Sequence, residues 1–174
     1  MFKLKQFNIL LFLITFSINS SILYTLEESE IRWPILIIIN ETARSNNIEL
    51  KLISLEYINE ALSLRYGNVD ISVLYDILRY LVFEGVKIIT PSNDVSNNYP
   101  IVRIEAIKLL GQLNIIEARM TLFEVLEFEY NPTVLQEAIK QIFINWSDFY
   151  SNDKEVEIIF NTIKKIQDLS KIEI

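Results

Sequence analysis

The chain has 174 residues, a net charge of −7 at pH 7, and neither cysteine nor histidine. The two absences exclude thiol nucleophiles, disulfide bonds, zinc sites built from cysteine and histidine, and catalytic bases that need an imidazole. Hydrophobic residues make up 51% of the chain, so it can bury a core, while three glycines and four prolines leave few tight turns for an all-β fold. The few basic residues are dispersed, and a nucleic-acid partner is therefore not expected.

The first 21 residues have the three-part layout of a secretory signal peptide. Lys3 and Lys5 precede an apolar run over residues 7–18, and a polar stretch reaches Ser21. The apolar run is about a dozen residues long, whereas a membrane-spanning helix needs roughly twenty. We therefore expect residues 1–21 to be removed during export and the mature protein to be periplasmic or secreted, in a bacterium. Two alternatives stay open: an N-terminal core helix, or an uncleaved segment that anchors the chain in a membrane.

Residues 22–174 are expected to form one all-α domain. Hydrophobic residues recur at three-and-four spacing in six segments that predict helices: 48–64, 71–84, 100–113, 116–128, 132–145 and 153–169. Residues 35–39 fit a buried strand or a buried helix, and we expect a helix because every later segment is helical. Gly67 is expected to end the first of the six helices, and Asp70 and Asp153 to cap the second and the last. Residues 85–99, rich in turn-forming side chains, predict one long loop.

The helical pattern also predicts which side chains face the core in the first two of these helices. In the helix at 48–64, Leu55, Tyr57 and Ile58 belong to the apolar face and Lys51 to the opposite, polar face. The helix at 71–84 has an apolar face formed by Leu74, Ile77, Leu78, Leu81 and Val82. Because the turn between them is short, the two helices are expected to run antiparallel.

A comparison of the chain with itself reveals a repeat with a spacing of 32 residues, in which Pro100 corresponds to Pro132. Five further identities follow within the next eight positions: Val102 with Val134, Glu105 with Glu137, Ala106 with Ala138, Ile107 with Ile139 and Lys108 with Lys140. A fixed period of this length indicates stacked helical hairpins, none of which can bury its apolar face alone.

The segment from Pro100 to Pro132 resembles the short HEAT repeats of the bilin-lyase type. In that family a proline opens the first helix, a small alanine allows close helix packing and a glycine ends the helix, and Pro100, Ala106 and Gly111 stand in these places. Ala118 and Leu122 match the positions that fill the layer between hairpins. The resemblance, which is clearest over residues 99–145, implies an α-solenoid of antiparallel hairpins, preceded here by the signal peptide.

The sequence also departs from the HEAT pattern. Many HEAT repeats carry an aspartate near the start and an arginine three residues after the proline, which can bridge successive units. Arg103 stands in the arginine place of one unit, but the next unit has Asn131 and Leu135. The resemblance therefore implies only a partial polar ladder between repeats. Over residues 48–84 it extends less closely, with Ser54, Leu55 and Ile58 matching Ala106, Ile107 and Leu110.

Candidate chemistry is limited to carboxylates. Glu117, Glu124 and Glu127 lie on one predicted helix, where a solvated acidic face explains them better than a paired-acid or metal site. The glycines are isolated, so no phosphate-binding loop is present. We accordingly predict no catalytic residue, no metal site and no cofactor.

The concave face of such a solenoid is usually lined by the second helix of each hairpin. With Leu74 and Leu78 superposed on Leu122 and Leu126, the positions that coincide alternate acids with aromatic residues, a composition suited to a protein or peptide partner. They are Asp76, Tyr80, Glu124 and Phe128. Packing of Tyr80 and Phe128 against the next hairpin explains these two aromatics equally well.

The sequence thus predicts an exported, non-enzymatic adaptor or scaffold that binds a protein or peptide in the bacterial envelope or periplasm. The alternatives are a carboxylate-based enzyme on the same scaffold and a membrane-anchored structural protein of the envelope.

Overall fold

The computed structural model describes residues 35–63, 70–87, 98–145 and 153–171. The chain divides into two compact units, residues 1–38 and residues 39–174. Three predictions concern residues that lie outside the described ranges: the signal peptide at 1–21, the helix end at Gly67 and most of the loop at 85–99.

The predicted all-α fold is confirmed, because the described ranges contain helices and no strand. Residues 35–43 are helical, as expected for the isoleucine-rich segment. Six further helices begin where the sequence predicts and end within one residue of the prediction: α2 Ile48–Ser63, α3 Ile71–Phe83, α4 Pro100–Gln112, α5 Ile116–Phe128, α6 Pro132–Asn145 and α7 Asp153–Leu169. Among the described helices, none combines the length and the hydropathy that crossing a membrane requires.

Local capping interactions explain several of the helix starts. Asp70 caps α3, since its carboxylate accepts hydrogen bonds from the backbone N–H of Ser72 at 2.9 Å and from the Ser72 hydroxyl at 2.6 Å. These bonds lower the pKa of the Asp70 carboxyl. Pro100 opens α4 at a position where its missing N–H costs no hydrogen bond. The sequence predicts Asp153 as a cap, but this residue is the first helical residue of α7. Its carboxylate still interacts favourably with the helix dipole, whose positive end lies at the N-terminus.

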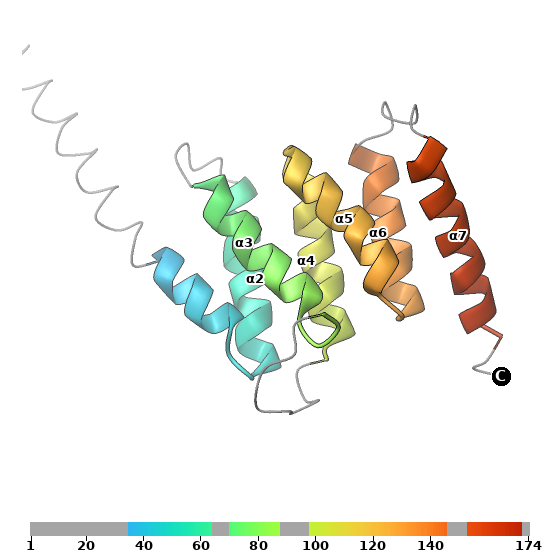
Figure 1. Cartoon of the computed structure of the whole chain (residues 1–174). Helices are drawn as coiled ribbons and strands as arrows, with labels where there is room; N and C mark the ends of the chain where they lie inside the picture. Colours follow the sequence, from blue (N-terminus) through green and yellow to red (C-terminus); the bar gives the residue numbers. More distant parts are fainter. Residues whose placement is uncertain (1–34, 64–69, 88–97, 146–152, 172–174) are drawn as a thin grey trace, which may run out of the picture. The chain divides into compact units, whose positions relative to one another are not determined.

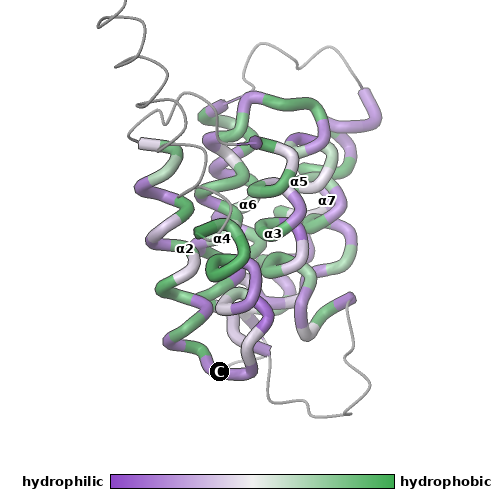
Figure 2. The backbone as a smooth tube through the Cα atoms, turned by 90° about the vertical axis from the view of Figure 1, so that its left-hand side faces the viewer, coloured by the Kyte–Doolittle hydropathy of each residue, from purple (hydrophilic) through white to green (hydrophobic). Residues whose placement is uncertain are grey.

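The six helices contact one another in a regular order. Helices α2, α4 and α6 pack in succession, as do α3, α5 and α7, and contacts of α3 with α4 and of α5 with α6 join the two sets. In Figure 1, α3 and α5 lie in front of α2 and α4. Hydrophobic and hydrophilic residues alternate along the helices (Figure 2), because each helix packs against its neighbours with part of its surface and exposes the rest.

Most predicted core positions are confirmed. The apolar face predicted for α3 is buried at all five positions, and Leu55 and Ile58 of α2 are also buried. The prediction is wrong for Tyr57, which is 49% exposed. It is also wrong for Lys51, whose surroundings are described in the next subsection.

Candidate functional site

The successive helix pairs α2–α3, α4–α5 and α6–α7 are the first, second and third hairpins. Lys51 forms a buried ion pair in the first of them. Its ammonium lies 2.6 Å from Oε2 of Glu84, and the two side chains are 0% and 3% exposed. The same ammonium donates a hydrogen bond of 2.8 Å to the backbone carbonyl of Ala43, near the end of the helix at residues 35–43. Helical periodicity predicts Lys51 on a polar face, but the side chain is buried. The carboxylate of Glu84 neutralises its charge and the carbonyl of Ala43 accepts a hydrogen bond from it, and these two interactions offset the cost of burial.

Tyr80, one of the four predicted partner-binding residues, belongs to this cluster. Its hydroxyl donates a hydrogen bond of 2.8 Å to Oε1 of Glu84, and the guanidinium of Arg44 lies 4.5 Å from the centre of its ring. Burial, together with the hydrogen bond and the negative charge of Glu84, raises the pKa of Tyr80 to about 12. The side chain is half-buried, and its described contacts are with Glu84, Lys51 and Arg44.

The raised pKa of Tyr80 makes a prediction for alkaline pH. Because the pKa rises from 10.0 to about 12 on folding, its contribution to stability is complete below pH 10 and is lost as the pH approaches 12. We expect the difference in tyrosinate absorbance between the wild type and Tyr80→Phe to appear near pH 12, under conditions in which both proteins stay folded by circular dichroism. A difference centred near pH 10 would show that Glu84 does not protect this hydroxyl.

A second buried ion pair occupies the corresponding place in the next hairpin. Nε of Arg103 lies 2.7 Å from Oε2 of Glu129, and the side chains are 3% and 5% exposed. Lys51 and Arg103 are each the fourth residue of their helix, and Glu84 and Glu129 each directly follow the helix that completes the hairpin. These two pairs lie within a hairpin, whereas the bridge that the resemblance implies would join successive units. The sequence comparison missed this correspondence because the basic partners differ, lysine in one hairpin and arginine in the other.

Glu124, another of the predicted residues, is held between two cations. Its carboxylate lies 2.9 Å from the guanidinium of Arg79 and also pairs with the ammonium of Lys87. Burial alone would raise the pKa of Glu124, but the hydrogen bonds and charges of these two partners outweigh it and lower the pKa. The acidic character predicted for this position is therefore largely neutralised.

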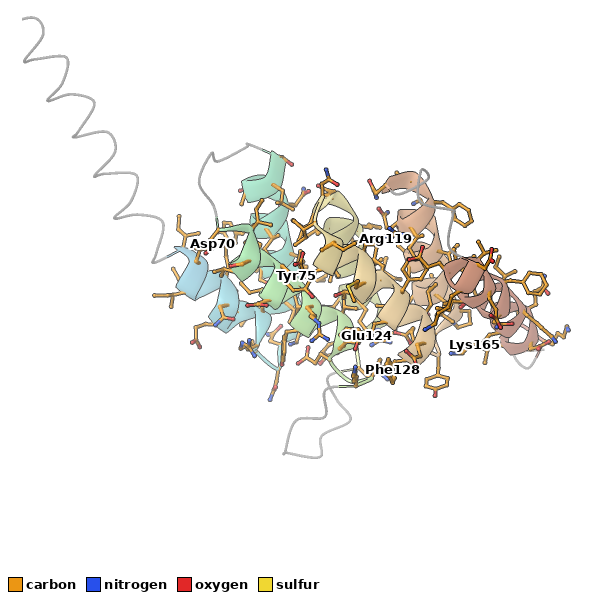
Figure 3. The ribbon with its side chains drawn as sticks, turned by 45° about the horizontal axis from the view of Figure 1, so that its top comes forward. Asp70, Tyr75, Arg119, Glu124, Phe128 and Lys165 are labelled. Atoms are coloured by element: carbon orange, nitrogen blue, oxygen red, sulfur yellow. The ribbon has the colours of Figure 1, made fainter. Side chains whose placement is uncertain are left out.

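Phe128 lies close to Glu124 on α5 (Figure 3) and shares one of its partners. The ammonium of Lys87 is 4.3 Å from the centre of the Phe128 ring and 5.4 Å from that of Phe83. Asp76 is exposed. The structure therefore joins Glu124 and Phe128 through Lys87, whereas Tyr80 has its contacts in the Lys51 cluster and Asp76 has no described contact with the other three.

The helix bounds also change the correspondence between α3 and α5. Both helices have 13 residues, both end with phenylalanine, and a glutamate follows each. This correspondence aligns Phe83 with Phe128 and Arg79 with Glu124, the two residues that form the ion pair across the helices. The superposition that aligned Tyr80 with Phe128 was shifted by almost one helical turn.

A mostly apolar groove of about 770 Å³ lies between α5 and α7. Met120 is 66% exposed and forms part of its lining with Ile116, Phe123 and Ile158. Charged residues of both signs complete both walls: Arg119, Glu124 and Glu127 of α5, and Lys154, Glu155 and Lys165 of α7. Glu124 is thus the one of the four predicted partner-binding residues that lines this groove. Sequence periodicity does not indicate Met120 as a groove residue, because that requires the position of α7.

Charged contacts connect the two walls of the groove. Arg119 of α5 forms an ion pair with Glu155 of α7. Lys165 of α7 donates a hydrogen bond of 2.6 Å to the backbone carbonyl of Glu129, and its ammonium is 4.4 Å from the centre of the Tyr130 ring. Burial lowers the pKa of Lys165. Figure 3 shows Arg119, Glu124 and Lys165 along this part of the unit.

Neither a metal centre nor a family assignment emerges. The described ranges contain no group of three or more acidic side chains placed to hold a metal ion. No family model, curated protein or solved structure matches the chain.

Proposed function

We propose that this chain is an exported, non-catalytic repeat protein of the HEAT type that binds a protein or peptide partner in the bacterial envelope or periplasm. The observation that carries the proposal is the groove between α5 and α7, where apolar side chains are exposed in a recess with charged residues of both signs on its walls. Exposed apolar surface rimmed by charges is typical of protein interaction sites.

The proposal includes an α-solenoid of stacked hairpins. It is supported by the successive contacts of α2, α4 and α6 and by the buried ion pair that recurs in the first two hairpins. Small or short side chains at one position of these three helices also support it, since Ser54, Ala106 and Ala138 are all 0% exposed. Short side chains there allow the neighbouring helices to approach closely.

The partner is expected to insert apolar side chains between α5 and α7. A methionine as exposed as Met120 can adapt to the shape of such an insert, and Phe123 offers a rigid aromatic surface beside it. Charged residues of both signs line the groove, so charged side chains along the edges of the partner contribute to specificity. A segment with an apolar ridge and both charges along its edges satisfies both walls.

Site-specific cross-linking tests the groove. A photo-cross-linking amino acid at position 120, in cells grown with an intact envelope, is expected to attach to one defined protein, identified by mass spectrometry. The matched control is the same amino acid at Ile144 of α6, which is 61% exposed and does not line the groove. Equal yields of the same product at both positions would overturn the proposal.

Affinity measurements with the captured protein then give the magnitude. Met120→Glu is expected to weaken binding about 30-fold or more, as for an anchoring residue at the centre of an interface, whereas Ile144→Glu should leave it unchanged. Glu124→Gln tests the predicted residue that lines the groove, and Phe128→Ala tests a predicted residue of α5 that does not line it. Export is tested separately, by N-terminal sequencing of the mature protein: a start after residue 21 supports it, and an intact Met1 contradicts cleavage.

A further inference from the structure

One side of α7 exposes an apolar stripe, formed by Val156, Phe160 and Ile163. These residues are 46%, 68% and 40% exposed, respectively. Their spacing, four residues and then three, places them along one side of the helix. A different side of α7 buries Ile159 and Thr162, and the helix packs against α5 and α6. The stripe therefore lies outside the contacts that hold α7 in the unit.

The stripe faces away from the preceding helix of its layer. Alignment of the first residues of α5 and α7, Ile116 and Asp153, assigns to the stripe three residues of α5 that line the groove toward α7: Arg119, Phe123 and Leu126. In Figure 1, α7 is the last helix after α3 and α5. Terminal units of repeat proteins usually have a polar outer face, which keeps them soluble. An apolar stripe at this place indicates a surface that another molecule covers.

One edge of the stripe carries two charges of opposite sign. Glu157 follows Val156 in the chain and Lys164 follows Ile163, so both charged residues lie on the same edge, two helical turns apart. Both side chains are exposed. Neither belongs to an ion pair within the part of the chain that the structure describes. Both charges are therefore available to a second molecule.

The order of these residues is self-complementary when two copies of α7 run antiparallel. The stripe then forms the seam of a short coiled coil, in which Phe160 of each copy lies opposite Ile163 of the other. In the same register, Glu157 of each copy lies beside Lys164 of the other, so two opposite-charge pairs form. In a parallel arrangement the two charged positions would instead face isoleucines of the second copy. Charge complementarity therefore favours the antiparallel pair.

We propose that α7 is a dimerisation helix, which packs through the stripe against α7 of a second copy of this chain, antiparallel and about a two-fold axis. A two-fold interface requires one patch that complements itself, and a seam with an acid and a base two turns apart on one edge meets this requirement. None of the residues of the stripe or of its charged edge lines the groove between α5 and α7. The dimer interface is thus separate from the proposed partner site.

Sedimentation velocity on the purified full chain tests the stripe. The wild type is expected to pass from monomer to dimer as its concentration rises, and to form nothing larger. Phe160→Glu places a carboxylate in the apolar seam of each copy and is expected to weaken dimerisation about 30-fold or more. The matched control is Ile101→Glu on α4, because Ile101 is 46% exposed, as Val156 is. This control should dimerise as the wild type does.

Glu157→Lys and Lys164→Glu test the antiparallel geometry. Each variant gives the edge two charges of one sign, so that two identical copies repel each other at both places. Each alone is expected to dimerise about tenfold more weakly than the wild type. An equimolar mixture of the two variants brings opposite charges together again at both places, and it should form mixed dimers about as strongly as the wild type forms its own.

Three outcomes would overturn the proposal. A wild type that is still monomeric at about 1 mM shows that the stripe does not bind a second copy. Equal dimerisation of Phe160→Glu and Ile101→Glu shows that the stripe is not the interface. A mixture of the two charge variants that associates no better than either alone shows that the helices do not pair antiparallel at this edge. Circular dichroism checks that each variant is folded, and the charge variants alone decide the question if Phe160→Glu unfolds.

Discussion

Lys51→Met is expected to lower the free energy of unfolding by about 3–5 kcal/mol. The substitution keeps the length of the buried stem but removes the charge, and it leaves the Glu84 carboxylate, 3% exposed, without its 2.6 Å partner. The carbonyl of Ala43 loses its 2.8 Å hydrogen bond as well. Hydrogen bonding by the Tyr80 hydroxyl compensates only part of this loss, because one neutral donor cannot replace an ammonium. Urea unfolding of both proteins measures the difference.

Two further variants separate the charge from the packing. Lys51→Met combined with Glu84→Gln removes both charges and is expected to recover at least half of the lost stability, since the cost arises mainly from an uncompensated buried charge. Lys140→Met breaks an ion pair with Glu137 in which the lysine side chain is 58% exposed, and it should change stability by less than about 1 kcal/mol. If the double variant were less stable than Lys51→Met, the explanation by an orphaned charge would be wrong.

Arg103→Met is expected to cost about 3 kcal/mol, at the lower end of the range for a broken buried ion pair. The reason is that Glu129 keeps other donors. Its Oε1 accepts hydrogen bonds of 2.8 Å from the backbone N–H groups of Tyr130 and Asn131, and both bonds remain when the guanidinium is removed. Arg103 also holds Asn98, through a hydrogen bond of 2.5 Å to Oδ1.

The losses of unfolding free energy in Lys51→Met and Arg103→Met can be compared directly. Denaturant unfolding under identical conditions should rank Arg103→Met as less damaging than Lys51→Met. Arg79→Met serves as the control, because its ion pair with Glu124 involves a side chain that is 41% exposed, and a loss below about 1 kcal/mol is expected. The reverse ranking would mean that the backbone N–H groups do not stabilise the Glu129 carboxylate.

The repeated ion pair gives the first two hairpins a common internal connection. In each hairpin a basic residue near the start of the first helix meets a glutamate just after the second helix. The third hairpin has Leu135 at the corresponding place in α6, and Lys165 of α7 instead reaches back to the carbonyl of Glu129. Lys165 therefore links the third hairpin to the second, and the ion pair that joins the two helices of each earlier hairpin does not recur at the corresponding place in the third.

Local sequence features were sufficient to predict the helices. Asp70 and the prolines at 100 and 132 act on residues within one turn of themselves, and the three-and-four spacing of apolar residues follows from the pitch of a single helix. The correspondence of Ala106 with Ala138 could also be read directly from identical residues at a fixed spacing. Each of these features depends on neighbours close in the sequence, and for that reason they were predicted correctly within the described ranges.

The environments of the functional candidates depend on distant parts of the chain. Lys51 is buried because Glu84, from the end of the next helix, neutralises it, and Glu124 is neutralised by Arg79 and Lys87 from another hairpin. The exposure of Met120 in a groove likewise depends on where α7 packs. Composition, capping residues and helical periodicity determined the chain's helices and the chemistry that it lacks. Only the packing of one helix on another decided which charges are paired and which apolar side chains stay exposed, because both are set by contacts between residues far apart in the chain.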